Sequence, residues 1–477
     1  MFAASLLHFL VEKSTIIDTI HAMCYIKQHN PFARNFMRKN TQLKLDILQV
    51  FKLSLPAILS QITTIIMQYI DSAMVGNLGA NASAAIGLVA STTWLFNGVT
   101  YAVNAGFSVQ VAHHIGAKQN SNARTVMRHA LISALCISLF LCVLGTLISS
   151  PLPVWLKGNS AIRKDAKVYF FVFALALPFS QLNGLCSSLL QCCGNMITPG
   201  ILNASMCLLD VIFNAIFIPK YGVLGAAIGT ALACIIISVV MFWCCCFANK
   251  KLSFFHREKG EFKAEILKKA FKIGYPVGLQ EIAMCGAMVV STAIIAPLGA
   301  VAVAANSFAI TAESLCYMPG YGIGSAATTL VGRSMGANDP KLAKRYGNIC
   351  TALGGIFMGA TGLLMALFCP YVSTLLTPVQ EVRDLATEVL RIGLIAEPLF
   401  GIAIVATGAL CGTGDTLVPS LMNLGSIWFV RIGLALILVK PLGLHGMWIA
   451  MATELCVRGL LMLYRQKTSK FYKRLKT

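Results

Sequence analysis

Twelve long apolar segments follow one another along the chain, and they constrain its fold more than any other feature. Each is long enough to cross the ~30 Å core of a bilayer as a helix, which takes about 20 residues. A strand of a membrane barrel needs only roughly 10 residues. The segments are 50–76, 83–112, 126–150, 167–190, 200–219, 223–248, 268–297, 301–331, 344–372, 386–410, 418–440 and 444–464. We therefore predict an all-α integral membrane protein with twelve transmembrane helices.

The composition agrees with this prediction. Hydrophobic residues make up 57% of the 477 residues, and charged residues make up 12%, against about 25% in soluble proteins. A soluble enzyme, a disordered tail protein and a DNA-binding domain are thereby excluded. The net charge of +20 is best explained by lysines and arginines that mark cytoplasmic loops. We expect no nucleic-acid partner.

The distribution of basic residues predicts the orientation. Of the 38 lysines and arginines, 29 fall at the two termini and in the loops near Lys118, between Lys250 and Lys272, and between Arg333 and Arg345. Only 8 fall in the alternate loops. Because basic loops stay on the cytoplasmic side, we expect both termini in the cytoplasm. The stretch Met1–Val11 is too short to cross and lacks the features of a signal peptide.

The two halves of the sequence repeat each other at an offset of 220 residues, without a gap over about 150 residues. Each half holds six spans, so we expect two parallel, pseudo-symmetric six-helix lobes related by an axis along the membrane normal. The matching pairs are Phe51-Lys52 and Phe271-Lys272, Pro56 and Pro276, Leu78-Gly79-Ala80 and Leu298-Gly299-Ala300, Ala84-Ala85 and Ala304-Ala305, Gly116-Ala117 and Gly336-Ala337, Pro178 and Pro398, Gly194 and Gly414, Pro199 and Pro419, and Asn203 and Asn423.

The repeat defines the predicted domains. They are a cytoplasmic extension over 1–44 with Met37 as an alternative start, an N-lobe over 45–247, a linker over 248–267, a C-lobe over 268–465 and a basic tail over 466–477. Transporters built from two such lobes bind substrate and ions near the lobe interface and rock one lobe against the other. The sequence therefore predicts a transporter.

Six of the 18 acidic residues fall inside spans, where a charge costs roughly 2.5–3.5 kcal/mol on insertion scales. These residues are Asp71, Asp210, Glu281, Glu313, Glu397 and Glu454. Intramembrane carboxyl groups mark ion or proton pathways, because burial disfavours their charged form. Asp210 and Asn214 are one helical turn apart, and with Asp71 they would form a polar cluster in the first lobe.

Structural explanations compete for some of these acids. Glu454 has Arg458 four residues later, which favours an ion pair on one helix. Arg431 lies inside a span and needs a counter-charge, for which Glu397 is a candidate. Glu397 also precedes Pro398 and could instead satisfy backbone groups that a kink frees. Glu313 could form a hydrogen bond within its lobe.

Other patterns carry less information. The 17 cysteines read as small packing hydrophobes. The run Cys244–Cys246 lacks metal-ligand spacing and is a weak candidate for acylation. The stretch Met318–Gly324 predicts a broken helix, with close packing of small residues as the alternative. No nucleotide-binding loop, zinc-protease motif or nucleophile elbow is present, so we expect no enzyme and no cofactor.

Several motifs in order resemble the multidrug and toxic compound extrusion (MATE) family of secondary transporters, over about residues 45–465. The matching stretches are Gln68–Gly76 in the first span, Ala296–Gly299 followed by Val303–Ala305, Cys411–Thr416 with Pro419, and the weaker copy Cys193–Asn195 with Pro199. The resemblance implies export of small amphipathic organic cations in exchange for protons or sodium.

The resemblance also implies site residues. Asp71 falls on the family's first-span aspartate, a cation-coupling residue. In the proton-linked branch the fifth span looks like Asn-x-x-x-Asp, whereas Asp210 and Asn214 stand in the reverse order here. Thr230 resembles a threonine that the sixth span adds to that site. Gln61, Gln68 and Tyr69 of the first span are candidates for the substrate cleft.

For the second lobe, the sodium-linked branch has acids where this chain has Met284 and Phe400. Glu281 and Glu397 each lie three residues earlier, which is about 300° of rotation and ~4.5 Å of rise along a helix. With Glu313, they are candidate coupling residues, and Glu281 with Glu397 is the candidate sodium site. The coupling ion stays open between protons and sodium.

The predicted function is a secondary active antiporter that works by alternating access. The main alternative is a lipid-linked sugar or polysaccharide flippase of the same wider fold, which should carry a strongly cationic cleft. A sensor or receptor would need a signalling domain, and an intramembrane enzyme would need catalytic spacing. We expect a monomer in contact with membrane lipids, multi-pass in a cell membrane, with the bacterial inner membrane favoured.

Overall fold

The computed structural model describes residues 31–254, 262–377 and 379–473. The described residues divide after Lys52 into two units. Helix α2 (Pro31–Gly76) runs through the boundary between them. In the first unit, Gln42 Nε2 donates a hydrogen bond to Asp46 Oδ1 over 3.1 Å. Most of the predicted extension 1–44, part of the linker 248–267 and the end of the tail lie outside the described residues.

The described part of the second unit is helical throughout. Its first half holds the rest of α2, α3 (Ala80–Gly116), α4 (Asn120–Ile148), α5 (Leu152–Trp155), α6 (Ser160–Cys192), α7 (Ile197–Tyr221), α8 (Val223–Trp243) and η1 (Cys244–Ala248). Its second half holds α9 (Ala264–Ile295), η2 (Ala296–Leu298), α10 (Ala300–Gly336), α11 (Pro340–Leu376), α12 (Gln380–Leu394), α13 (Glu397–Thr413), α14 (Leu417–Gly425), η3 (Ser426–Ile432), α15 (Gly433–Leu442), α16 (Leu444–Thr468) and η4 (Lys470–Lys473).

The number of spans agrees with the twelve predicted segments. Among the described residues, 11 helices are long and apolar enough to cross a membrane. The bent pair α12 and α13 supplies the twelfth if it counts as one span. All backbone groups of such helices bond within the segment, which is why apolar stretches of this length are stable as helices in lipid. The predicted all-α membrane fold is confirmed.

The backbone of the second half repeats that of the first. Helices α3 and α10 begin and end 220 residues apart. The glycines after α6 and α13 are both left-handed, with φ of +84° at Gly194 and +86° at Gly414. Their amides donate to equivalent carbonyls, those of Gln191 and Cys411, over 2.8 Å in each case. A left-handed glycine is the usual way to end a helix, because it carries no Cβ.

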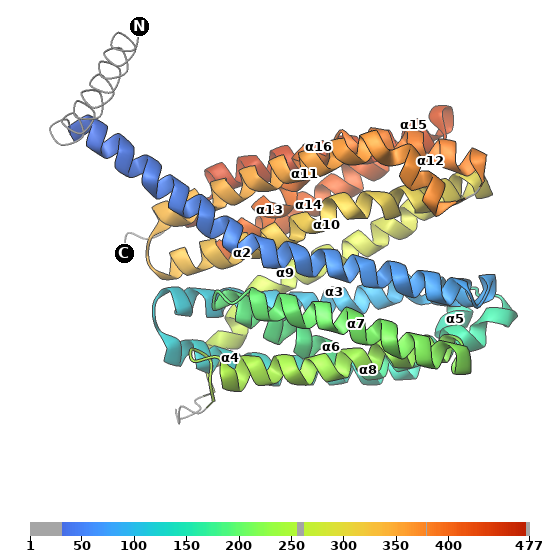
Figure 1. Ribbon diagram of the computed structural model, residues 1–477, viewed down its shortest axis with the longest axis horizontal. Helices are drawn as coiled ribbons and strands as arrows, with labels where there is room; N and C mark the ends of the chain where they lie inside the picture. Colours follow the sequence, from blue (N-terminus) through green and yellow to red (C-terminus); the bar gives the residue numbers. More distant parts are fainter. Residues whose placement is uncertain (1–30, 255–261, 378, 474–477) are drawn as a thin grey trace, which may run out of the picture. The chain divides into compact units, whose positions relative to one another are not determined.

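Figure 1 shows two groups of roughly parallel helices. The N-lobe comprises α3 to α8 with residues 53–76 of α2, and the C-lobe comprises α9 to α16. The first helix of each lobe also packs against the second helix of the other. A Cβ added at Gly322 in α10 would lie 2.7 Å from the Ile58 amide nitrogen of α2, and one at Gly274 in α9 would lie 2.7 Å from the Ala102 carbonyl oxygen of α3.

The lobes meet most closely where α3 and α10 end. A Cβ added at Gly116 would lie 1.9 Å from the Arg333 carbonyl oxygen, and one at Gly336 would lie 1.9 Å from the His113 carbonyl oxygen. The two contacts are related by the 220-residue repeat. Only glycine permits two backbones to approach so closely.

Burial along α3 and α10 changes midway. Residues 102–112 of α3 and 322–332 of α10 are almost all buried, whereas the preceding halves of both helices have many partly exposed positions. The change falls at Tyr101 and Tyr321, which are 57% and 38% exposed. The lobes therefore pack tightly at the end that contains Gly116 and Gly336 and less tightly toward the opposite end.

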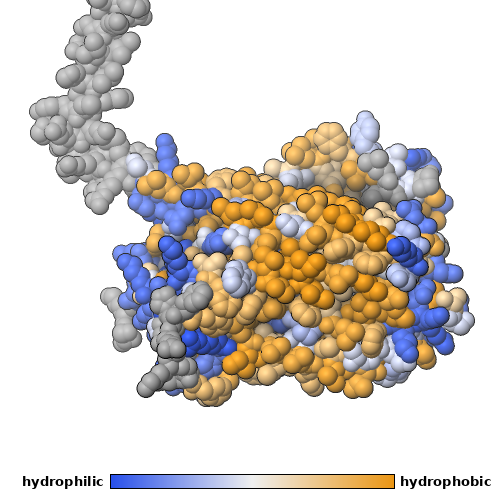
Figure 2. Space-filling view, turned by 60° about the horizontal axis from the view of Figure 1, so that its bottom comes forward, coloured by the Kyte–Doolittle hydropathy of each residue, from blue (hydrophilic) through white to orange (hydrophobic). Residues whose placement is uncertain are grey.

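The surface supports a membrane setting. Figure 2 shows a broad apolar band across the visible face, with hydrophilic residues gathered at its two ends. Large apolar side chains stand exposed on several helices, such as Phe140 and Leu147 on α4 at 66% and 70%, and Leu208 on α7 at 67%. A water-facing protein does not expose apolar surface on this scale, whereas lipid tails cover it.

The predicted break at Met318–Gly324 is wrong. Helix α10 runs through this stretch, and its glycines serve close packing: a Cβ at Gly320 would lie 2.5 Å from the Met358 sulfur. The break lies instead between α12 and α13, at an angle of 56°. Pro398 stands in the first turn of α13, where its missing N–H costs least. The equivalent Pro178 lies inside a continuous α6, so proline alone does not cause the break.

Candidate functional site

The structure joins the three residues that the sequence assigns to a polar cluster in the N-lobe. The Asn214 amide nitrogen donates to Asp71 Oδ1 over 2.9 Å and to Asp210 Oδ2 over 3.2 Å. Asp71 comes from α2, while Asp210 and Asn214 share one face of α7. Asp210 and Asn214 are 0% and 1% exposed. One buried amide therefore bridges two carboxyl groups.

This cluster has unused acceptor atoms. Asp210 Oδ1 and Asn214 Oδ1 are buried and have no hydrogen-bond partner among the described residues. Two nearby carboxylates repel each other when both are charged, and buried acceptors without partners are costly. A proton or a small cation bound here would relieve both penalties. Asp71 itself is half-buried, so the cluster is not sealed on every side.

Thr230 is half-buried on α8, which packs against α7 of this cluster. The preceding residue, Gly229, is so close to Asn214 that an added Cβ would lie 2.2 Å from the Asn214 side-chain oxygen. The backbone of α8 therefore packs directly on the amide that bridges the two aspartates.

A second acidic pair lies in the C-lobe. Glu313 of α10 and Glu397 of α13 are 4% and 1% exposed, and they are electrostatic neighbours. Both carboxyl oxygens of Glu397 and Oε1 of Glu313 are buried without a hydrogen-bond partner among the described residues. The interpretation in which Glu397 satisfies the kinked backbone is therefore wrong. The pair is a second place where buried oxygens could receive a cation.

Glu281 lies apart from this pair, against the other lobe. A Cβ added at Gly98 of α3 would lie 2.8 Å from Glu281 Cβ. The electrostatic neighbours of Glu281 include Tyr101 and Tyr321. The structure thus pairs Glu397 with Glu313 and places Glu281 at the interface between lobes.

Tyr101 and Tyr321 were not singled out from the sequence. They are equivalent in the 220-residue repeat, and that equivalence is the signal that could have found them. Both side chains are exposed, and Glu281 is an electrostatic neighbour of both. Two aromatic rings beside one carboxyl group are suited to an organic cation, through cation–π and charge attraction.

Glu454 has a structural role, and the predicted partner of Arg431 is wrong. Glu454 accepts from both Arg431, at 2.7 Å, and Arg458, at 2.6 Å, and is fully buried. The Ser426 hydroxyl also donates to it over 2.9 Å. The predicted Glu454–Arg458 pair is confirmed. Arg431 reaches Glu454 of the following span instead of Glu397, because η3 and α16 are packed side by side.

The three residues assigned to the cleft in the first span differ in their surroundings. Tyr69 donates its hydroxyl to the Thr311 carbonyl of α10 over 2.5 Å, so it links α2 to the C-lobe. Gln61 is half-buried and Gln68 is exposed. Gln61 is the repeat equivalent of Glu281.

The motif at Cys411–Thr416 closes one end of the lobe interface. The His113 ring of α3 bonds to the Gly412 carbonyl of α13 over 2.8 Å. Asp415 accepts from Arg465 and from the Ser469 hydroxyl over 2.8 Å and 3.0 Å, which holds the end of α16. These residues have structural contacts and lie on the same side as Gly116 and Gly336.

Two pseudo-symmetric lobes of membrane-spanning helices, with buried carboxyl groups in each lobe and at their interface, define a multi-pass membrane transporter. The sequence profile of the MatE family matches residues 56–216 and 276–437, one match in each lobe. The chain belongs to the MatE family, as its motifs predicted, and it is a transporter.

Relatives and solved structures agree with this assignment. The chain is 27% identical to a probable multidrug resistance protein NorM of Thermotoga maritima, over 89% of this chain and 93% of that protein. It is 26% identical to the multidrug resistance protein NorM of Burkholderia vietnamiensis, over 87% and 92%.

Among solved structures, a MATE transporter in the straight conformation has a TM-score of 0.85 at 21% identity, over 90% of this chain and 97% of that chain. The Vibrio cholerae MATE transporter VcmN in the bent form has a TM-score of 0.82 at 18% identity, over 91% and 99%. These similarities confirm the two-lobe fold.

Proposed function

We propose that this protein is a secondary active antiporter that exports small amphipathic organic cations in exchange for protons or sodium. The observation that carries the proposal is the Asp71–Asn214–Asp210 cluster, in which one buried amide bridges two carboxyl groups and leaves acceptors unused. Such a group can bind and release one cation per cycle. The names of the NorM relatives, which are multidrug resistance proteins, support export of drugs.

The proposed cycle uses the lobe interface. Tyr101, Tyr321 and Glu281 would bind the organic cation, since both rings are exposed and lie close to this carboxyl group. Contacts at Gly116, Gly336 and His113 would close the opposite end. With the basic loops in the cytoplasm, this arrangement would be the outward-facing state. Cation entry at Asp71 would then favour release of the substrate.

The remaining features of the proposal follow from the same reasoning. The protein would act as a monomer surrounded by lipid, in a bacterial inner membrane, with both termini in the cytoplasm. Glu313 and Glu397 would be the alternative coupling site if the ion is sodium, since their buried oxygens lack partners. The six intramembrane acids outnumber Arg431 and Arg458 in the spans, which supports cationic substrates over lipid-linked phosphates.

The test is efflux of ethidium from proteoliposomes with either a proton gradient or a sodium gradient. We expect Asp71→Asn to lower ion-driven efflux at least tenfold, because the amide cannot exchange a cation. Asp384→Asn is the matched control, since Asp384 is exposed and bonds only locally to Gln380. Efflux by Asp71→Asn at the wild-type rate would contradict the mechanism. Absence of efflux under both gradients would favour the flippase.

A further inference from the structure

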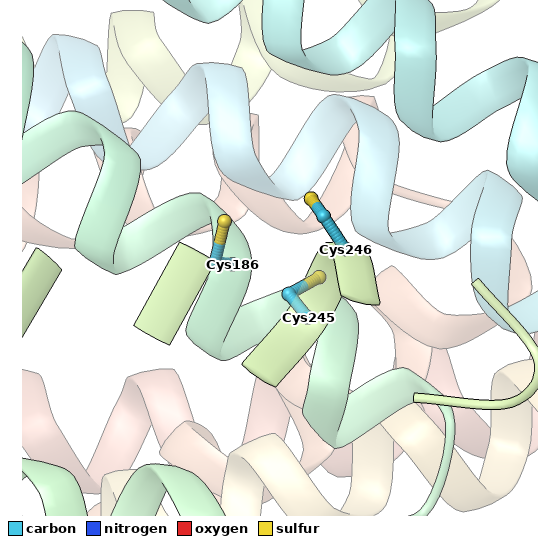
Figure 3. A group of neighbouring side chains, drawn as sticks. All are labelled: Cys186, Cys245 and Cys246. Atoms are coloured by element: carbon cyan, nitrogen blue, oxygen red, sulfur yellow. The ribbon is translucent and has the colours of Figure 1, made fainter. Parts of the chain in front are cut away.

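Three cysteines meet inside the N-lobe, away from the proposed transport site. Cys186 comes from α6, and Cys245 and Cys246 come from η1 at the end of α8 (Figure 3). Their sulfur atoms all lie within 4.8 Å of one another, and each residue is 0% exposed. The sequence reasoning missed this group because Cys186 stands 59 residues before Cys245.

The local helix geometry brings the two neighbouring cysteines to one side. Residues Cys244–Ala248 form a π-helix, a rare turn with wider spacing that is frequent at functional sites. In an α-helix, consecutive side chains point about 100° apart, and the wider π turn reduces that angle. Both Cys245 and Cys246 therefore reach the face that packs on α6.

The spacing of the three sulfurs fits a single soft centre. At a distance of about 2.3 Å from one central atom, three sulfurs lie at most ~4 Å apart, which is close to the spacing of this group. The group contains no histidine or carboxylate among the described residues. Structural zinc takes four ligands, so a three-thiol group is a poor zinc site.

The net charge of the complex decides which thiophilic ion or atom these three sulfurs can hold. The thiols belong to an apolar cluster that includes Phe107, Leu189 and Met241. A divalent ion held by three thiolates would leave a net negative charge in these surroundings, which is costly. A trivalent centre held by three thiolates is neutral.

We propose that Cys186, Cys245 and Cys246 form a binding site for trivalent arsenic or antimony. Arsenous acid, As(OH)3, is neutral and small. Three As–O bonds break and three As–S bonds form, and each thiol proton leaves with a hydroxide as water. No atom changes oxidation state, and both reactants and product are uncharged. The product links the end of α8 to α6.

The test uses arsenite as the probe with purified, reduced protein in detergent. We measure bound arsenic per chain by mass spectrometry after desalting, and arsenic ligation by X-ray absorption. We expect the wild type to bind one arsenic, surrounded by three sulfurs. Cys186→Ala, Cys245→Ala and Cys246→Ala should each weaken binding at least tenfold, because two thiols remain.

Matched controls remove thiols outside the group. Cys136→Ala and Cys456→Ala should bind arsenite as the wild type does, since Cys136 is exposed and Cys456 is half-buried, and neither belongs to the group. Arsenite should also raise the thermal unfolding temperature of the wild type and of these controls. It should not raise that of the three cluster variants.

Two outcomes would overturn the proposal. The first is equal arsenic content in the wild type and in the cluster variants. The second is an arsenic atom with oxygen neighbours in the wild type. The unfolding transition without arsenite shows which variants fold. If an alanine variant fails to fold, the matching Cys→Ser variant replaces it. X-ray absorption of the wild type shows the ligands of arsenic without any variant.

Discussion

At the scale of single residues, the buried charges fall into two kinds. Glu454 is surrounded by two arginines and a serine, so its charge is fully compensated. Asp210 Oδ1, Glu313 Oε1 and both carboxyl oxygens of Glu397 lack hydrogen-bond partners among the described residues. Compensated charges hold helices together, whereas uncompensated acceptors are available for an ion.

Glu454→Gln tests the structural role of the first kind. The substitution removes the carboxylate that bonds to both Arg431 and Arg458, and removal of one partner from a buried ion pair costs about 3–5 kcal/mol. We expect a loss of stability of this order, measured by reversible denaturation in detergent. Glu388→Gln is the control, because its pair with His445 is 2.9 Å long but exposed and worth only about 0–1 kcal/mol. Equal effects of the two changes would refute this assignment.

Much of the site could be predicted from the sequence, and the reason for the rest is physical. The Asp71–Asp210–Asn214 cluster followed from helical spacing and the family motifs. The partner of Arg431 could not be predicted, because a long side chain can reach a neighbouring span. Which spans are neighbours depends on packing that the sequence alone does not show. The cysteine group was missed for the same reason, since it joins residues from α6 and η1.

At the scale of elements, glycines decide how closely helices approach. Gly116 and Gly336 permit the crossing of α3 and α10, whereas Gly87 on α3 has open space around its Cβ position. The repeat of Gly116 and Gly336 is visible in the sequence. The glycines near Met318, however, led to the prediction of a broken helix. The pattern of small residues is the same for a break and for close packing, so only the three-dimensional contacts distinguish them.

Adding a methyl group at the crossing should separate the ends of α3 and α10. We expect Gly116→Ala combined with Gly336→Ala to increase the distance between spin labels placed at Lys118 and Asn338, and to slow transport at least tenfold. An added Cβ at either position would lie 1.9 Å from a backbone oxygen, so the helices must move apart. Gly87→Ala should leave both quantities unchanged. An unaltered distance in the double variant would show that the crossing is not a closing contact.

At the scale of the whole molecule, the lobes are connected by contacts as well as by the chain. Helix α9 packs on α3 of the N-lobe, and Gly322 of α10 packs on α2. These contacts should therefore hold the lobes together when the chain is divided between them.

We expect the two halves to assemble when they are produced as separate chains divided within residues 255–261. The halves should purify together through a tag on either one, and the pair should export ethidium at a rate within about threefold of the intact protein. Each half alone should export none. Halves that fail to purify together would show that the interface depends on the covalent connection.

The 220-residue repeat gives the backbone nearly the same form in both lobes, but the acidic residues do not follow it. The equivalents of Asp71, Glu281 and Glu397 are Ser291, Gln61 and Leu177. Because the axis that relates the lobes runs along the membrane normal, it does not exchange the two sides of the membrane. The lobes therefore share an orientation and a backbone but differ in their ionisable side chains. Exchanging these side chains between the copies is a change that the protein should tolerate poorly.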